Sequence, residues 1–300
     1  MAPTIFRDYD QAALDAQYDN RAKVPEFPAY LERFRSRSAA ARERFATTAR
    51  LDVAVGETPI ERVDIFPAPP AADGRPAPVL VFLHGGYWLM LDKQDFSFVA
   101  NGFAPHGITT VIVNYALIPS VRMDELVRQC RQATAWTLAN AATFGGDPAR
   151  VAVSGHSAGG HLTAMVGATD WARFTAPRVA APVTLRPIAG YALSGLHDLV
   201  PICRCYLQQN LQLTEREVAD NSPVRLPPPA AGAWIAIVGG KEGPEYERQS
   251  RDLAASWGTV ASAEIAAGHD HFSIMMALDD PQDPLTRRIA DDLLRRRSGS

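Results

Sequence analysis

Cysteine is scarce in this chain, which has Cys130, Cys203 and Cys205 among its 300 residues. An odd count without a Cys-x-x-Cys pair excludes a disulfide-stapled scaffold and is typical of a protein in a reducing compartment. No matching group of metal ligands stands near Cys203 and Cys205 in the sequence, so we expect no metal site.

Charge of one sign and long apolar runs are lacking as well. The formal net charge is -3 and the basic residues are scattered, which excludes the electrostatic footprint of a nucleic-acid-binding protein. The N-terminal residues have no cationic stretch followed by an apolar one, and no apolar run reaches membrane length. We therefore expect a soluble cytoplasmic protein that acts on a small-molecule substrate, without nucleic acid or membrane as partner. The sequence leaves open whether it forms a homodimer.

Short apolar runs alternate with helical patterns from about residue 77 onward. Continuous apolar runs, as expected for strands covered on both faces, lie at 79–83, 109–113, 151–153, 188–193 and 234–238. Between the second and third run, apolar residues from Met123 to Ala133 have the spacing of an amphipathic helix. This βαβ rhythm predicts an α/β fold with a mainly parallel sheet and right-handed crossovers.

The rest of the chain is interpreted around that sheet. Two opening strands are expected at 51–55 and 62–66, followed by a proline-rich connection. Residues 197–230 interrupt the rhythm, and we interpret them as a helical cap over the carboxyl edge of the sheet. The chain is thus predicted to be one domain spanning 1–300, with an N-terminal helical arm at about 1–50 and the cap at about 197–230.

A glycine-flanked serine follows the predicted strand at 151–153. The pentapeptide Gly155-His156-Ser157-Ala158-Gly159 has the pattern of a nucleophile elbow, a sharp turn from strand to helix. Such a turn strains the serine backbone and leaves no room for side chains two residues on either side. A serine hydroxyl is a poor nucleophile at neutral pH, so acyl transfer also requires a base, an acid that orients it and donors for the oxyanion.

The oxyanion donors are predicted from a second motif. His84-Gly85-Gly86-Tyr87-Trp88 follows the strand at 79–83, where the oxyanion loop of an α/β-hydrolase lies. Its glycines allow backbone N–H groups to approach a substrate closely. We expect the amides of Gly85, Gly86 and Ala158 to form the oxyanion hole. Two such motifs, each at a predicted strand end, together indicate an α/β-hydrolase.

The acid and the base are predicted from loops nearer the C-terminus. Glu242 stands a few residues after the strand at 234–238, whereas Asp198, after the strand at 188–193, is the alternative acid. His271 follows the last predicted strand and is our candidate base, with His269 as the alternative. The resulting order of serine, acid and histidine is the one that this fold uses.

These motifs resemble those of the kynurenine formamidase (arylformamidase) branch of the α/β-hydrolases, close to the hormone-sensitive-lipase-like esterases. The strings HGGYW at 84–88 and GHSAGGHL at 155–162 carry the resemblance. YDQAALDAQYDNR, FGGDPARVAVSG, GGKEGPEYERQS and HDHF are similar as well, so the likeness covers most of the chain. Glu242 departs from the aspartate that is common in these formamidases.

The resemblance implies an eight-stranded, mostly parallel sheet with helices on both faces and a small helical cap. It also implies a serine hydrolase that cleaves aryl formamides, such as N-formyl-L-kynurenine to kynurenine and formate, or related amides and esters. The reaction passes through an acyl-enzyme and requires no cofactor. The alternatives are a general carboxylesterase for short-chain or aryl esters and a non-catalytic ligand-binding protein.

Four aromatic or polar residues are candidates for substrate binding. Tyr87 and Trp88 are expected to pack against an aromatic leaving group, because both follow the oxyanion glycines. Tyr18 and Asn20, in the N-terminal arm, are expected to form a second wall of the acyl pocket.

Overall fold

A computed structural model describes residues 3–179 and 185–296 and contains one eight-stranded sheet. Its strands are β1 (Arg50–Ala54), β2 (Arg62–Phe66), β3 (Ala77–Leu83), β4 (Thr109–Val113), β5 (Gly146–His156), β6 (Ala189–Leu193), β7 (Ala233–Gly239) and β8 (Ala261–Ala266). The order across the sheet is β1-β2-β4-β3-β5-β6-β7-β8. The β1–β2 and β2–β4 pairs are antiparallel and the other pairs are parallel, which confirms the predicted fold class.

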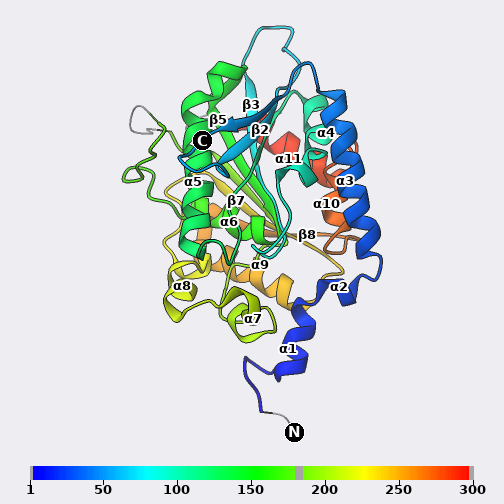
Figure 1. Ribbon diagram of the computed structural model, residues 1–300, viewed down its shortest axis with the longest axis vertical. Helices are drawn as coiled ribbons and strands as arrows, with labels where there is room; N and C mark the ends of the chain where they lie inside the picture. The colour runs from blue at the N-terminus through cyan, green and yellow to red at the C-terminus, as the bar shows by residue number, and fades with distance from the viewer. Residues whose placement is uncertain (1–2, 180–184, 297–300) are drawn as a thin grey trace.

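Helices cover both faces of this sheet (Figure 1). The helices in the described part of the chain are α1 (Gln11–Tyr18), α2 (Asn20–Lys23), α3 (Phe27–Arg44), α4 (Val99–Phe103), α5 (Met123–Asn140), α6 (Ala158–Gly167), α7 (Gln208–Leu211), α8 (Glu215–Asp220), α9 (Pro244–Trp257), α10 (Ser273–Ala277) and α11 (Pro284–Arg295). Short 3₁₀ turns connect several of them.

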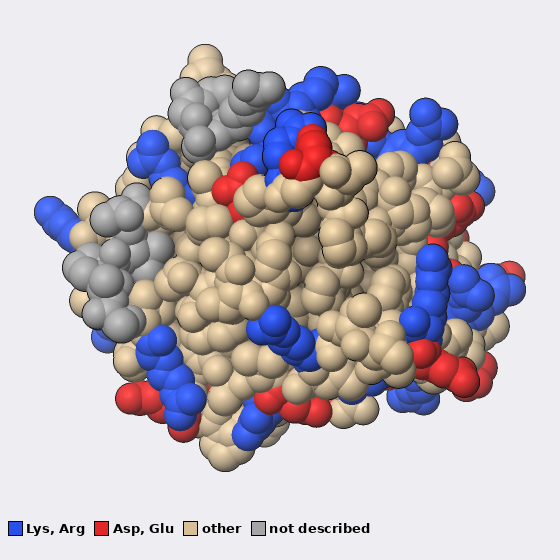
Figure 2. Space-filling view, turned by 90° about the horizontal axis from the view of Figure 1, so that it is seen from above, with Lys and Arg blue, Asp and Glu red and all other residues tan. Residues whose placement is uncertain are grey.

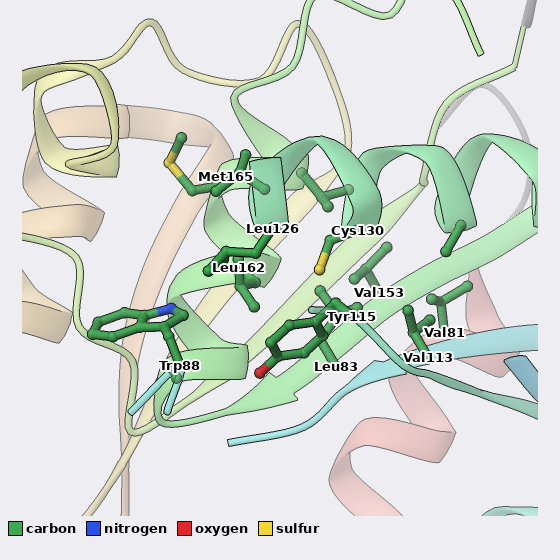
Figure 3. Packing of buried hydrophobic residues seen from close by; sticks show 14 of the residues in the cluster. Val81, Leu83, Trp88, Val113, Tyr115, Leu126, Cys130, Val153, Leu162 and Met165 are labelled. Atoms are coloured by element: carbon green, nitrogen blue, oxygen red, sulfur yellow. The ribbon is translucent and has the colours of Figure 1, made fainter. Parts of the chain in front are cut away.

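The apolar run of β3 supplies two cores because successive side chains of a strand point to opposite faces. Val79, Val81 and Leu83 pack on one face with residues of α5 and α6, as Figure 3 shows for Val81, Leu83 and their neighbours. Leu80 and Phe82 pack on the other face with residues of α3, α4, α10 and α11. A continuous apolar strand is therefore required, as the sequence indicated.

The N-terminal helices lie against the segment 197–230. That segment contains α7, α8 and the 3₁₀ turns Ile202–Arg204 and Pro223–Arg225. Gln11 donates a hydrogen bond to the carbonyl of Arg204 (3.0 Å), and the amide of Tyr206 donates to Asp15 (2.7 Å). Figure 1 shows α1, α7 and α8 at one end of the molecule, near α9.

The described surface and helices carry two further observations. On the face seen in Figure 2, acidic and basic side chains lie scattered around a largely uncharged centre. Within residues 3–179 and 185–296, each helix is too short or too polar to cross a membrane.

Candidate active site

Ser157 stands at the sharp turn between β5 and α6. Its backbone has φ of 57° and ψ of -117°, a strained conformation for a residue with a side chain. A Cβ on Gly155 would lie 2.3 Å from the carbonyl oxygen of Gly159, and one on Gly159 would lie 1.9 Å from that of Leu83. Both glycines are thus required, because α6 starts in backbone contact with the end of β3.

Three buried side chains form a continuous hydrogen-bonded chain at this turn. His271 Nε2 lies 3.0 Å from Ser157 Oγ, and His271 Nδ1 lies 2.6 Å from Glu242 Oε2. The other carboxylate oxygen of Glu242 accepts hydrogen bonds from Ser194 Oγ and from the amide of Gly239, both at 2.6 Å. Ser157, His271 and Glu242 thus have the geometry of the nucleophile, base and acid of a catalytic triad.

The two alternative residues lie in other interactions. Asp198 forms an ion pair with Arg248 at 3.5 Å, and its backbone amide donates to Gln249. His269 accepts a hydrogen bond from the amide of Lys241 through its backbone carbonyl. The structure brings Glu242 and His271 to Ser157, and it does not bring Asp198 or His269 there.

The ring of His271 is held among other rings. The ring centroids of His156 and Tyr246 lie 4.6 Å and 4.8 Å from that of His271. Burial, and secondarily the charge of His271, hold the pKa of His156 well below its usual value. A protonated His271 therefore has a neutral ring beside it rather than a second cation.

The predicted oxyanion residues surround Ser157. A Cβ on Gly85 would lie 3.3 Å from Ser157 Cβ, so the loop backbone is in contact with the elbow. Gly86 has φ of +114°, and a Cβ there would lie 2.1 Å from the carbonyl oxygen of Met90. Ala158 is the first residue of α6, where amides lack intrahelical acceptors. No backbone carbonyl in the described part of the chain accepts from the amides of Gly85, Gly86 or Ala158.

A mostly apolar cavity of about 50 Å³ opens over these groups. The end of the cavity at Ser157 is formed by Gly85, Gly86, His156, Ser157 and His271. Its wall consists of Asn20, Arg21, Phe27, Leu31, Phe34, Tyr87, Met90, Leu91, Phe96 and Phe272. The N-terminal helices supply much of this wall, whereas no residue of 197–230 is among the lining residues.

Two of the four predicted binding residues line this cavity, namely Asn20 and Tyr87. Trp88 is instead fully buried in the core, edge-on to His161, and Figure 3 shows it there beside the β-sheet core. The side chain of Tyr18 is also buried, and its hydroxyl donates to Glu245. The side chains of Tyr87 and Trp88 point in different directions, because both residues lie in a turn and have positive φ.

A polar network ties the N-terminal arm to the oxyanion loop. Asn20 Nδ2 donates to the hydroxyls of Tyr87 (2.8 Å) and Tyr246 (2.7 Å). The hydroxyl of Tyr87 in turn donates to the carbonyl of Tyr18 (2.5 Å). Sequence reasoning missed Tyr246 and Ser194, since an isolated tyrosine on a helix and a serine after a strand have no distinctive pattern.

The cysteines take no part in this site. Cys130 and Cys205 are buried, Cys203 is partly buried, and all three are free. Across residues 3–179 and 185–296, no group of three or more His, Cys, Asp or Glu side chains is arranged to hold a metal ion.

The chain is similar to known kynurenine formamidases over most of its length. The kynurenine formamidase of Salmo salar is 31% identical to this chain over 248 residues, which cover 80% of each protein. The chain belongs to the kynurenine formamidase family. The resemblance read from the motifs is thereby confirmed, and the chain is a hydrolase of the formamidase and esterase type.

Further comparisons agree with this family. A family model described as BD-FAE matches residues 63–186. A solved structure from Silicibacter sp. TM1040, assigned provisionally as a thioesterase, is 29% identical with a TM-score of 0.78 and covers 91% of this chain and 97% of its own. Esterase B from Lactobacillus rhamnosis is 15% identical with a TM-score of 0.67, covering 92% and 94%, and shows the shared fold alone.

Proposed function

We propose that this formamidase-family hydrolase cleaves the formyl amide of N-formyl-L-kynurenine, releasing kynurenine and formate, with Ser157, His271 and Glu242 as its catalytic triad. The triad assignment is supported by the continuous chain of hydrogen bonds from Ser157 through His271 to Glu242, which lies beneath the cavity. The substrate class is supported by the kynurenine formamidase relative. The mostly apolar wall also suits an aromatic leaving group.

In the first step, Ser157 Oγ attacks the formyl carbon while His271 Nε2 accepts the hydroxyl proton. Glu242 stabilises the resulting imidazolium through the 2.6 Å contact with Nδ1 and holds the ring in the required tautomer. The amides of Gly85, Gly86 and Ala158 hold the oxyanion, and each such donor contributes about 3–4 kcal/mol in comparable sites.

In the second step, His271 gives its proton to the arylamine nitrogen as the C–N bond breaks, leaving a formyl ester on Ser157. Water then attacks that ester, His271 accepts the proton of the water and returns it to Ser157 Oγ, and formate leaves.

The test is hydrolysis of N-formylkynurenine by the wild-type protein and by Ser157→Ala. We expect measurable kcat/KM for the wild type and a loss of about 10⁶ in kcat for the variant, as in other serine hydrolases. A circular-dichroism spectrum and thermal melt check that the variant is folded. Turnover retained by folded Ser157→Ala would refute the proposed nucleophile.

The second candidate is a carboxylesterase for aryl or short-chain esters. It is favoured by the arrangement of Ser157, His271 and Glu242, which serves esters and amides alike. Measuring kcat/KM for formanilides and for aryl acetates side by side separates the two functions, because the formamidase function requires efficient amide cleavage. A non-catalytic role is disfavoured by the hydrogen-bonded triad.

We also propose that the protein acts in the reducing cytoplasm. Its three cysteines are free, and reduced thiols persist in that compartment.

A further inference from the structure

Arg21 is the one exposed residue among the described residues that line the cavity. None of the other described lining residues is Lys, Arg, Asp or Glu. It lies on α2, at the end of the N-terminal arm. The cavity is otherwise formed by apolar side chains, the polar Asn20 and Tyr87, and the catalytic groups. A single cation therefore stands at the solvent side of an apolar site.

The guanidinium of Arg21 is held between opposite walls. Its Cζ lies 4.9 Å from the ring centroid of Phe27, on α3, and its Nη2 lies 3.1 Å from Met90 Sδ, in the segment after the oxyanion glycines. These contacts position the side chain across the rim. A placed guanidinium loses less entropy on binding an anion than a free lysine does.

No described acid is close enough to form an ion pair with Arg21. The nearest acid in the sequence, Asp19, caps α2 by accepting from the amide of Ala22 at 3.0 Å. A guanidinium has five N–H donors in a planar fork, and Met90 uses one weakly. The remaining donors can bind a carboxylate, whose two oxygens match the guanidinium fork in bidentate geometry.

A formyl group has no substituent by which it can be recognised. If the substrate is a formamide, any charged group must belong to the leaving arylamine. We propose that Arg21 binds a carboxylate on the leaving-group side of the substrate and so makes the enzyme select aryl substrates that carry this carboxylate over those that lack it. This inference rests on the proposed function, since it assigns a specificity residue to the same site.

The decisive comparison uses N-formylkynurenine and its carboxamide, which differ only at the carboxylate. In Arg21→Gln and Arg21→Met we expect KM for N-formylkynurenine to rise about tenfold with kcat nearly unchanged, because the interaction is equal in ground and transition state. KM for the carboxamide stays unchanged. Arg21→Met keeps the apolar stem against Phe27, so it separates charge from packing.

Arg33→Gln is the matched control, because Arg33 is also exposed on the N-terminal arm but does not line the cavity. It should leave both KM values unchanged. Arg21→Lys should recover part of the lost affinity, and the effect should weaken as salt rises from 50 to about 500 mM. An equal rise in KM for both substrates, or no rise for either, would overturn the proposal.

Failure of the proposed function is distinguishable from failure of this inference. If the wild type cleaves neither formamide, the proposed substrate is wrong. The role of Arg21 is then tested with phenyl acetate against 3- and 4-acetoxybenzoate, which carry a carboxylate on the leaving group. A KM increase confined to the acetoxybenzoates in Arg21→Met supports the carboxylate subsite, and equal KM changes across these esters refute it.

Discussion

Glu242 uses both of its carboxylate oxygens, one toward His271 and one toward the strand ends. Oε2 contacts the imidazole, while Oε1 accepts from Ser194 and from the amide of Gly239. Glu242 has one methylene more than the aspartate that is common in these formamidases. The turn after β7 has room for it, because the backbone and the carboxylate of Glu242 both fold back onto Gly239. The carboxylate is thus buried, and both of its oxygens are fixed by hydrogen bonds. A carboxylate held in this way can orient the histidine ring.

Glu242→Gln should lower kcat by about 10⁴, because an amide in this place stabilises neither the imidazolium nor the required tautomer. Asp198→Asn is the control and should retain wild-type kcat, since Asp198 pairs with Arg248 away from the triad. Steady-state kinetics on an activated aryl ester measure both. Loss of activity in Asp198→Asn together with an active Glu242→Gln would reverse the assignment of the acid.

At the scale of elements, the elbow depends on how closely α6 approaches β3. Gly159 has an ordinary helical backbone, so nothing in the local conformation requires glycine there. The requirement comes from the carbonyl oxygen of Leu83, 1.9 Å from where a Cβ would stand. The strand that precedes the loop at 84–88 and the helix that follows Ser157 are therefore held at a fixed separation.

Gly159→Ala should destabilise the protein by about 3 kcal/mol or more, although alanine is the better helix former, because backbone atoms must move to admit the methyl group. Gly107→Ala is the matched control: its added Cβ meets nothing within 4 Å, and only the positive φ of 73° costs about 1–2 kcal/mol. Urea unfolding midpoints measure both. Equal destabilisation by the two changes would contradict the clash.

The element positions were largely predictable, and the walls of the cavity were not. The run at 109–113 matches β4 because a strand covered on both faces is apolar throughout, and the strand expected at 62–66 matches β2. The pattern of α3 shows only which of its faces is apolar. That Phe27, Leu31 and Phe34 cover the nucleophile, while 197–230 does not line the cavity, depends on how distant segments pack.

For the whole molecule, four buried histidines make stability depend on pH. Burial is the main cause that lowers the pKa of His84 and His161 to about 4 and that of His197 to about 3, and it lowers that of His156 as well. In the unfolded chain each histidine titrates near 6.5. Below pH 6.5 the unfolded state therefore binds protons that the folded state excludes, so stability falls as pH falls toward 4.

We expect the free energy of unfolding to decrease between pH 6.5 and pH 5, by up to about 1.4 kcal/mol per pH unit for each of these histidines. Above pH 7 they contribute no slope, because they are neutral in both states. Urea titrations at a series of pH values measure the slope in a range where carboxylates remain ionised.

His197→Leu isolates one member of this group. Neither ring nitrogen of His197 has a hydrogen-bond partner among the described residues, so the change removes a titrating group without breaking a hydrogen bond. The slope of the free energy of unfolding against pH, between pH 6.5 and 5, should decrease by the contribution of one histidine, up to about 1.4 kcal/mol per pH unit. An unchanged slope would show that His197 does not contribute to the loss of stability in acid.

The sequence was enough to predict the sheet, the sharp turn at Ser157 and the glycine loop at 84–88, because apolar runs and glycine spacing act between residues close along the chain. It also placed Glu242 and His271 among the candidates. The folded structure was needed to show that these two residues, rather than Asp198 and His269, meet Ser157, and that Arg21 lines the cavity while Trp88 lies in the core. Those outcomes depend on which loops and helices meet at the carboxyl edge of the sheet, and that is a property of packing between distant segments.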